Sequence, residues 1–332
     1  MFNSMKKISG EISYPCTFSL VKIPAIPISA DIVRSAGRWG IPLLRRSTDA
    51  SSAGNTISAE CIMHISNTSI PKSKSARKAI LYFHGGSYIM GCMDSYRGLH
   101  SRLVAATQLP VYSVEYCLAP ESKYPAQLYD AYCAYMHLCR NLGYKACDIV
   151  VAGDSAGSNL TLALWQLVRA HNEPIGALIL VSPWVDISYT RETWYSNAKI
   201  DYLQRENVDD PESSVRKLLG YSDLSDESQK RSIQLIKELA RDPFVAPIYA
   251  DLTELPPTLI QVGELEAMYS DICEFAARAI ESVHLCKGDK KRGPVELQVL
   301  PDGVHSFYLA TPDMRGVDKF WQNIGTFIQS LG

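Results

Sequence analysis

Residues 150–165 read VVAGDSAGSNLTLALW, an apolar segment that passes through a serine flanked by glycines into a second apolar segment. Gly153 and Gly157 stand two residues before and two residues after Ser155. In a tight turn from a strand into a helix, these two positions pass close to neighbouring backbone, so a side chain at either one collides. The spacing therefore predicts a strand over 148–153, a helix directly after it, and a sharp turn that lifts the Ser155 hydroxyl above the strand end. The hydroxyl then lies beside the first free amides of the helix, which is the geometry of a nucleophile.

Apolar runs of strand length recur along the chain and alternate with segments of helix length. Several runs are nearly continuous in Val, Ile and Leu, which is typical of parallel strands buried on both faces. The alternation predicts an open parallel α/β sheet. The expected strands cover 57–65, 79–84, 111–116, 148–153, 177–182, 258–263 and 295–300, and the expected helices include 124–142, 156–171 and 271–285.

Two portions of the chain do not follow this alternation. Residues 1–50 form the first, and residues 186–245, which are rich in Tyr, Asp, Ser, Arg and Lys, form the second. We assign both to a cap over the sheet. The expected organisation is an N-terminal cap segment over 1–50, then a catalytic domain over 51–332 that carries a cap insertion at about 186–245.

Composition excludes several classes of protein. The chain has 332 residues, 46% of them hydrophobic and 20% charged, as in an ordinary globular protein. A formal charge of −2 without a long basic block argues against a nucleic-acid site. Nine scattered cysteines without zinc-ligand spacing predict no metal site and favour a reducing, cytoplasmic location. The sequence contains no apolar stretch of roughly 20 residues, so we expect no membrane span. The absence of a basic block makes a small molecule the expected partner.

A second glycine turn, HGGSYIMG, begins at His84 directly after an expected strand. Attack by a serine on an acyl carbon puts negative charge on oxygen, and backbone amides without intervening side chains stabilise that charge. His84 belongs to the turn itself, so we expect it to fix this loop rather than to act as the base. The expected oxyanion donors are the amides of Gly85, Gly86, Ser87 and Ala156.

A nucleophilic serine needs a base, and the base needs an orienting carboxylate. His305 follows the last expected strand in a glycine-containing loop, where it can reach the edge that carries Ser155. The acid should follow the preceding strand, in the stretch GELEAMYSD, where Glu264, Glu266 and Asp271 compete. Glu266 lies in the middle of that loop, whereas Asp271 opens the next helix and has a credible role as its cap. We therefore prefer Glu266, with the other two as alternatives.

Five stretches taken together resemble the hormone-sensitive-lipase-like branch of the α/β-hydrolase carboxylesterases. The resemblance covers roughly residues 78–330. It is carried, in this order, by HGGSYIMG, VEYCLAPESKYPAQLYDAY, VAGDSAGSNL, DPFVAPIYADLTELPPTLIQVGELEAMYSD and DGVHSFY.

The resemblance implies an α/β-hydrolase fold with a mostly parallel eight-stranded sheet, flanking helices and a helical cap. It implies a triad of Ser155, Glu266 and His305 that hydrolyses small-molecule esters of short to medium acyl chains without a cofactor. Ser87 and Ser158 replace small residues usual in the family, and Glu266 replaces the commoner Asp.

Two other functions fit the same residues. An amidase or formamidase would use the same triad on an amide substrate. A non-catalytic small-molecule receptor of this fold is less favoured, because such receptors resemble the family with the histidine lost, and His305 is present. The sequence leaves the physiological substrate and the oligomeric state open.

Overall fold

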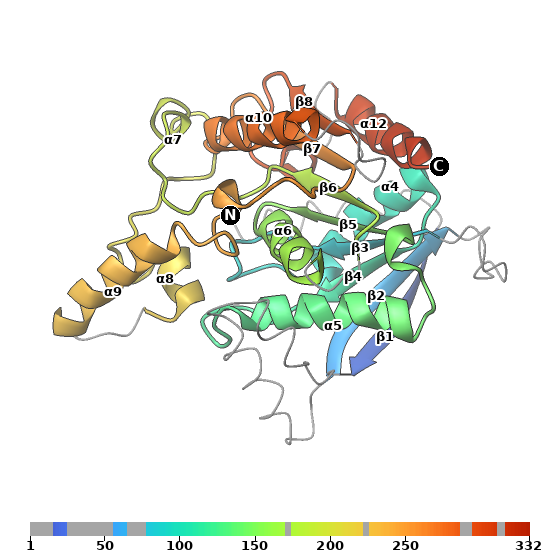
Figure 1. Ribbon diagram of the computed structural model, residues 1–332, viewed down its shortest axis with the longest axis horizontal. Coiled ribbons are helices and arrows are strands. Elements are labelled where there is room, and N and C mark those ends of the chain that lie inside the picture. The colour runs from blue at the N-terminus through green and yellow to red at the C-terminus, as the bar shows by residue number, and fades with distance from the viewer. Residues whose placement is uncertain are drawn as a thin grey trace.

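The computed structural model describes residues 16–24, 56–64, 78–169, 174–221, 226–285, 294–310 and 316–332. These described residues form one eight-stranded sheet of order β1-β2-β4-β3-β5-β6-β7-β8 (Figure 1). β2 runs antiparallel to its neighbours β1 and β4, and every other neighbouring pair is parallel. The strands are β1 (Cys16–Pro24), β2 (Thr56–His64), β3 (Ala79–Phe83), β4 (Val111–Glu115), β5 (Ile149–Asp154), β6 (Ala177–Val181), β7 (Thr258–Gly263) and β8 (Val295–Leu300).

The seven strands expected from the sequence are present as β2 to β8, and the expected mostly parallel α/β sheet is confirmed. β3 shows why its sequence is continuously apolar. Leu81 and Phe83 pack on one face of the sheet and Ile80 and Tyr82 on the other, since successive side chains of a strand alternate. All five residues of this strand are buried, so both faces need apolar side chains.

Helices cover both faces of the sheet (Figure 1). One core joins the sheet to α5 (Ala126–Arg140), α6 (Ala156–Arg169) and α10 (Tyr269–Leu285), which match the three expected helices. A second core joins the opposite face to α4 (Arg97–Thr107) and α12 (Val317–Ser330), which lie outside the expected set. The shorter elements are η4 (Met93–Tyr96), η5 (Ala146–Asp148), α7 (Thr193–Ser196), α8 (Ser214–Leu219), η6 (Pro247–Tyr249) and α11 (Phe307–Ala310), with α9 (Asp226–Leu239) as a longer helix of the insertion.

The segment between β6 and β7 contains the expected insertion. It holds α7, α8 and α9, and the last two stand to one side of the sheet in Figure 1. This agrees with the helical character expected for part of 186–245. That the segment caps a substrate site stays a prediction.

β1 corrects one boundary of the expected N-terminal cap. Residues 16–24 pair with β2 along their whole length, so these nine residues belong to the sheet and not to a cap. Ile23 is buried in the core while Leu20 faces outward, which shows a strand half covered at the sheet edge. The other residues of 1–50 lie outside the described residues.

None of the helices within the described ranges is both long enough and apolar enough to span a bilayer.

Candidate active site

The turn between β5 and α6 has the close backbone approach expected from its glycines. Ser155 has φ of +52°, a left-handed conformation that is uncommon for a non-glycine residue. A Cβ at Gly157 would lie 2.6 Å from the carbonyl oxygen of His84, and a Cβ at Gly153 would lie 2.5 Å from the carbonyl carbon of Gly157. Both positions are too crowded for any side chain. The backbone amide of Ser155 donates to Val181 O at 2.9 Å, which anchors the turn to the end of β6.

Ser158, where the family usually has glycine, adds a second link in this turn. Its hydroxyl donates to Gly153 O at 2.6 Å and accepts from the amide of Val181 at 3.1 Å. The hydroxyl therefore joins β5 to β6 beneath the turn that carries Ser155, called here the nucleophile turn. The serine that replaces the family's usual glycine is thus accommodated by two polar contacts.

The glycine turn after β3 has an unusual backbone conformation. Gly86, Ser87 and Tyr88 have φ of 114°, 54° and 63°, and successive backbone N–H groups in a turn can line an anion-binding concavity. A Cβ at Gly86 would lie 2.7 Å from the carbonyl carbon of Met90, so glycine is required there. In the part of the chain that the structure describes, no hydrogen bond uses the amides of Gly86, Ser87 or Ala156. These three amides remain available to an oxyanion.

Gly85 has a different role from the one expected. Its amide donates to Asp154 Oδ1 and to the Tyr96 hydroxyl, each at 3.0 Å. An amide held by a buried carboxylate is not available to a substrate oxygen. The expectation that Gly85 supplies an oxyanion donor is therefore wrong, and its amide instead anchors the loop.

Asp154 is the buried anchor that sequence reasoning missed. Besides Gly85, it accepts hydrogen bonds from the hydroxyls of Tyr82 at 2.9 Å and Tyr96 at 2.8 Å. Burial raises the pKa of Asp154 to about 6, although these hydrogen bonds oppose the shift. Its donors come from β3, from the loop after β3 and from η4, so no local pattern around the serine reveals the contact.

His84 fixes the glycine turn, as expected. Its ring is buried, its Nδ1 lies 2.8 Å from Gly85 O, and it stacks on Tyr116 with ring centroids 4.3 Å apart. The Tyr116 hydroxyl donates to His84 O at 2.6 Å. Burial lowers the pKa of His84 to about 4, so the ring is neutral near pH 7. A ring held on this many sides does not serve as a mobile base.

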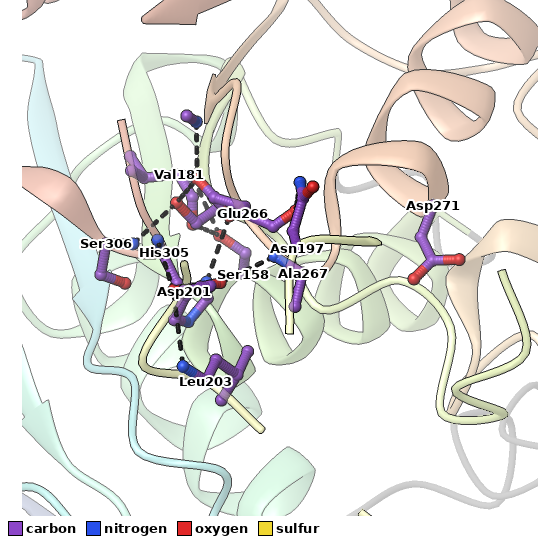
Figure 2. Close-up of polar contacts among 12 residues, drawn as sticks. Ser158, Val181, Asn197, Asp201, Leu203, Glu266, Ala267, Asp271, His305 and Ser306 are labelled. Carbon is purple, nitrogen blue, oxygen red and sulfur yellow. Dashed lines mark hydrogen bonds and ion pairs between the residues drawn. The ribbon is translucent and has the colours of Figure 1, made fainter. Parts of the chain in front are cut away.

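Glu266 and His305 form a buried pair (Figure 2). Glu266 Oε2 lies 3.2 Å from His305 Nδ1. Glu266 Oε1 accepts from the Ser182 hydroxyl and from the Gly263 amide, both at 2.6 Å. Burial raises the pKa of Glu266 even though all of these donors oppose the shift.

The electrostatic surroundings of His305 favour its charged form. Burial lowers the pKa of His305, but the hydrogen bond and charge of Glu266, with the charges of Asp201 and Asp154, outweigh burial. The pKa of His305 therefore stands above its ordinary 6.5. This is the behaviour needed in a base that becomes an imidazolium during reaction.

The two alternative acids lie apart from the histidine. Asp271, at the start of α10, accepts from Trp194 Nε1 at 2.7 Å and pairs with Arg191 at 2.9 Å, and Figure 2 shows it away from His305. Glu264 is exposed to solvent. Of the three candidate acids, Glu266 alone contacts His305.

Ser182 is a second residue that sequence reasoning missed. It links the turn that carries Ser155 to the loop after β8 that carries His305, called here the histidine loop. It directly follows Val181, which holds the amide of Ser155, and its hydroxyl also accepts from the Ser306 amide at 3.2 Å. Ser182 has φ of +44°, so it adopts a strained backbone at the site. Its signal is weak in sequence, because one serine after a strand is common.

The carboxyl ends of the parallel strands place these groups at one edge of the sheet. Ser155 follows β5, Glu266 follows β7 and His305 follows β8, and in parallel strands these ends lie at one edge of the sheet. Among the described side chains, no group of three His, Cys, Asp or Glu residues is arranged to hold a metal ion.

Comparison with known proteins agrees with this architecture. A family model described as the alpha/beta hydrolase fold matches residues 80–309. An esterase of Acinetobacter venetianus is 34% identical over 212 residues, a match that covers 63% of this chain and 64% of that relative, just under two thirds of its length. An acetyl-hydrolase of Streptomyces hygroscopicus is 30% identical over 254 residues and is matched over 76% of both chains.

Solved structures give the same result over nearly the whole chain. An esterase from the bacterial hormone-sensitive lipase family superposes with a TM-score of 0.72 at 25% identity, covering 99% of this chain and 90% of that one. The family match spans more than half of the chain and includes both the nucleophile turn and the histidine loop. The chain therefore belongs to the α/β-hydrolase fold family of serine hydrolases, in the branch of the hormone-sensitive-lipase-like esterases.

Proposed function

We propose that the chain is a carboxylesterase that cleaves esters of short to medium acyl chains through an acyl-enzyme on Ser155. The observation that carries the proposal is the buried contact of 3.2 Å between His305 Nδ1 and Glu266 Oε2, at the sheet edge that also carries the strained serine turn. An oriented imidazole and a hydroxyl on such a turn are the two parts that acyl transfer requires.

The contact between the acid and the histidine defines the proton path. Because ionised Glu266 only accepts hydrogen bonds, the proton of neutral His305 belongs on Nδ1, which leaves Nε2 free to accept. His305 Nε2 then takes the hydroxyl proton as Ser155 attacks the acyl carbon. Glu266 stabilises the resulting imidazolium, since opposite charges in a buried site attract strongly.

The amides of Gly86, Ser87 and Ala156 donate hydrogen bonds to the substrate oxygen and stabilise the negative charge that develops on it. The imidazolium next donates its proton to the leaving alcohol, and the acyl-enzyme forms. Water then attacks the acyl-enzyme with His305 as the base, which releases the acid and restores the serine.

The expected partner is a small-molecule ester, and we infer a cytoplasmic location from the odd number of scattered cysteines among the 332 residues. The names of the relatives, which include an esterase and an acetyl-hydrolase, support ester rather than amide hydrolysis.

Labelling and turnover test the proposal together. The wild-type protein should react with a fluorophosphonate and should hydrolyse p-nitrophenyl esters from acetyl to dodecanoyl, with a maximum among the shorter chains. Ser155→Ala should lose labelling and at least about 10³-fold in kcat while the protein stays folded. Ser95→Ala, which changes an exposed serine, is the matched control and should keep both.

Three results would contradict the proposal. Retained activity in Ser155→Ala would remove the serine from the mechanism. Faster turnover of matched amides than of esters would indicate an amidase. Tight ligand binding without labelling or turnover would indicate a receptor.

A further inference from the structure

The insertion between β6 and β7 contacts the backbone of both the acid loop and the histidine loop (Figure 2). Directly after α7, the Asn197 side-chain amide donates to Glu266 O at 3.0 Å. Four residues later, Asp201 is buried, with 3% of its surface exposed. A buried carboxylate needs hydrogen-bond donors, and the donors of Asp201 show what it holds in place.

Asp201 accepts one backbone amide from each loop. Its Oδ2 accepts from the Ala267 amide at 2.7 Å, and its Oδ1 accepts from the His305 amide at 3.1 Å. Ala267 directly follows Glu266, so one side chain fixes the backbone at both members of the acid–histidine pair. Its Oδ1 also accepts from the Leu203 amide at 3.4 Å, which holds the carboxylate in its own loop.

Asp201 also brings a second negative charge close to the imidazole. The groups that act on His305 come from four elements, and the charged ones among the described residues are three carboxylates. They are Glu266 from the loop after β7, Asp154 from β5 and Asp201 from the insertion, while the ring of Tyr202 lies 6.0 Å from the imidazole and the Ser182 hydroxyl holds the next residue, Ser306.

We propose that Asp201 is a positioning residue of the acid–histidine pair, which holds both loops in register and favours the imidazolium by its charge. The proposal rests on the proposed esterase function. It gives the insertion a part in catalysis, because the carboxylate that holds the backbone of the acid loop and the histidine loop belongs to that segment and not to the sheet.

Asp201→Asn separates this role from an ordinary structural one. An asparagine keeps the shape, but its NH₂ faces one of the two loop amides, donor against donor, and its charge is gone. We expect kcat on p-nitrophenyl butyrate to fall by about 10- to 100-fold, as for a small misplacement of a catalytic group. Loss of the negative charge should also move the acid midpoint of the kcat/KM profile to lower pH, by roughly half a unit or more.

A second variant, Asp201→Glu, separates charge from position. The longer side chain keeps the charge but displaces the carboxylate, so kcat should fall while the acid midpoint stays near the wild-type value. Asp209→Asn, which changes an exposed carboxylate of the same insertion, is the matched control and should leave both quantities unchanged.

The outcomes are distinguishable from a failure of the proposed function. Activity that survives in Ser155→Ala would overturn that function whatever Asp201 does. With Ser155 required, an unchanged kcat in Asp201→Asn would overturn the positioning role. A midpoint shared by Asp201→Asn and the wild type, or shifted equally in Asp201→Glu, would overturn the charge effect.

Discussion

Glu266→Gln is the sharpest perturbation of the acid–histidine pair. Two donors, the Ser182 hydroxyl and the Gly263 amide, converge on Oε1 of Glu266, whereas His305 Nδ1 faces Oε2. A glutamine has one carbonyl oxygen, and two donors at 2.6 Å hold that oxygen at the Oε1 position. The NH₂ group must then face His305.

The amide forces the imidazole into the wrong tautomer. An NH₂ facing Nδ1 requires Nδ1 to accept, so the proton of neutral His305 moves to Nε2, which is the atom that must take the proton of Ser155. The same change of tautomer lowers kcat by about 10⁴ in serine proteases. At about 1.4 kcal/mol per tenfold, the barrier in Glu266→Gln should rise by roughly 4–6 kcal/mol, a loss of about 10³–10⁴ in kcat.

Asp271→Asn is the matched control, because it changes the competing carboxylate by the same chemistry. Asp271 is engaged with Trp194 and Arg191 and has no contact with His305 in the described structure. Its kcat should stay within a few-fold of the wild type, and any effect should be on thermal stability.

The assay measures kcat for p-nitrophenyl butyrate, normalised to the fraction of active sites by a titrating fluorophosphonate. Thermal melts of both variants verify that they are folded. The reasoning is refuted if Glu266→Gln keeps more than a tenth of the wild-type kcat, or if Asp271→Asn loses 100-fold and so takes the place of the acid.

Three further outcomes follow from the same contacts. Because the pKa of His305 stands above its ordinary 6.5 and the base must be neutral, kcat/KM should fall as pH drops, with its half-maximum above 6.5; a midpoint below 6 in a pH–rate profile would contradict this. Gly157→Ala should lower the free energy of unfolding, measured in urea, by about 1–3 kcal/mol or more, because the new Cβ overlaps neighbouring backbone. A Cβ at Gly143 meets nothing within 4 Å, so Gly143→Ala should cost about 1 kcal/mol, from the left-handed φ alone. Equal losses in the two variants would contradict the crowding argument. Asp154→Ala should lower kcat by about 100-fold because it releases the glycine loop that carries the proposed oxyanion donors, while Asp154→Asn keeps an acceptor for the Gly85 amide and should stay within tenfold of wild type.

Local patterns were enough to predict the central strands and the nucleophile turn. Strands buried on both faces are continuously apolar, and the two glycines around Ser155 answer a steric demand that arises within a few residues of chain. β1 was not predicted, because its sequence contains Lys22 and Pro24 and buries little beyond Ile23. It is a strand because it pairs with β2, and β2 lies too far along the chain for a short window of sequence to include both.

The site could be predicted only in part for a related reason. The order of strand ends indicated Ser155 and His305, and loop position favoured Glu266 over two neighbouring carboxylates. The glycine motif could not show that the Gly85 amide is already held by Asp154, since the two residues are 69 positions apart. Asp201 is 104 positions from His305 and had no motif of its own.

The groups that hold His305 and favour its charged form include residues that no sequence motif indicates. A serine on a strained turn is positioned by its own neighbours, but the histidine depends on carboxylates that come from β5, from the loop after β7 and from the insertion. Each of these charges favours the imidazolium, and Asp201 also fixes the backbone of two loops. If Asp201 is the positioning residue proposed above, a change in the insertion alters the basicity and the placement of His305 while the sequence GDSAG stays intact. On the proposed mechanism, the reactivity of Ser155 therefore depends on the contacts around His305 as well as on its own turn.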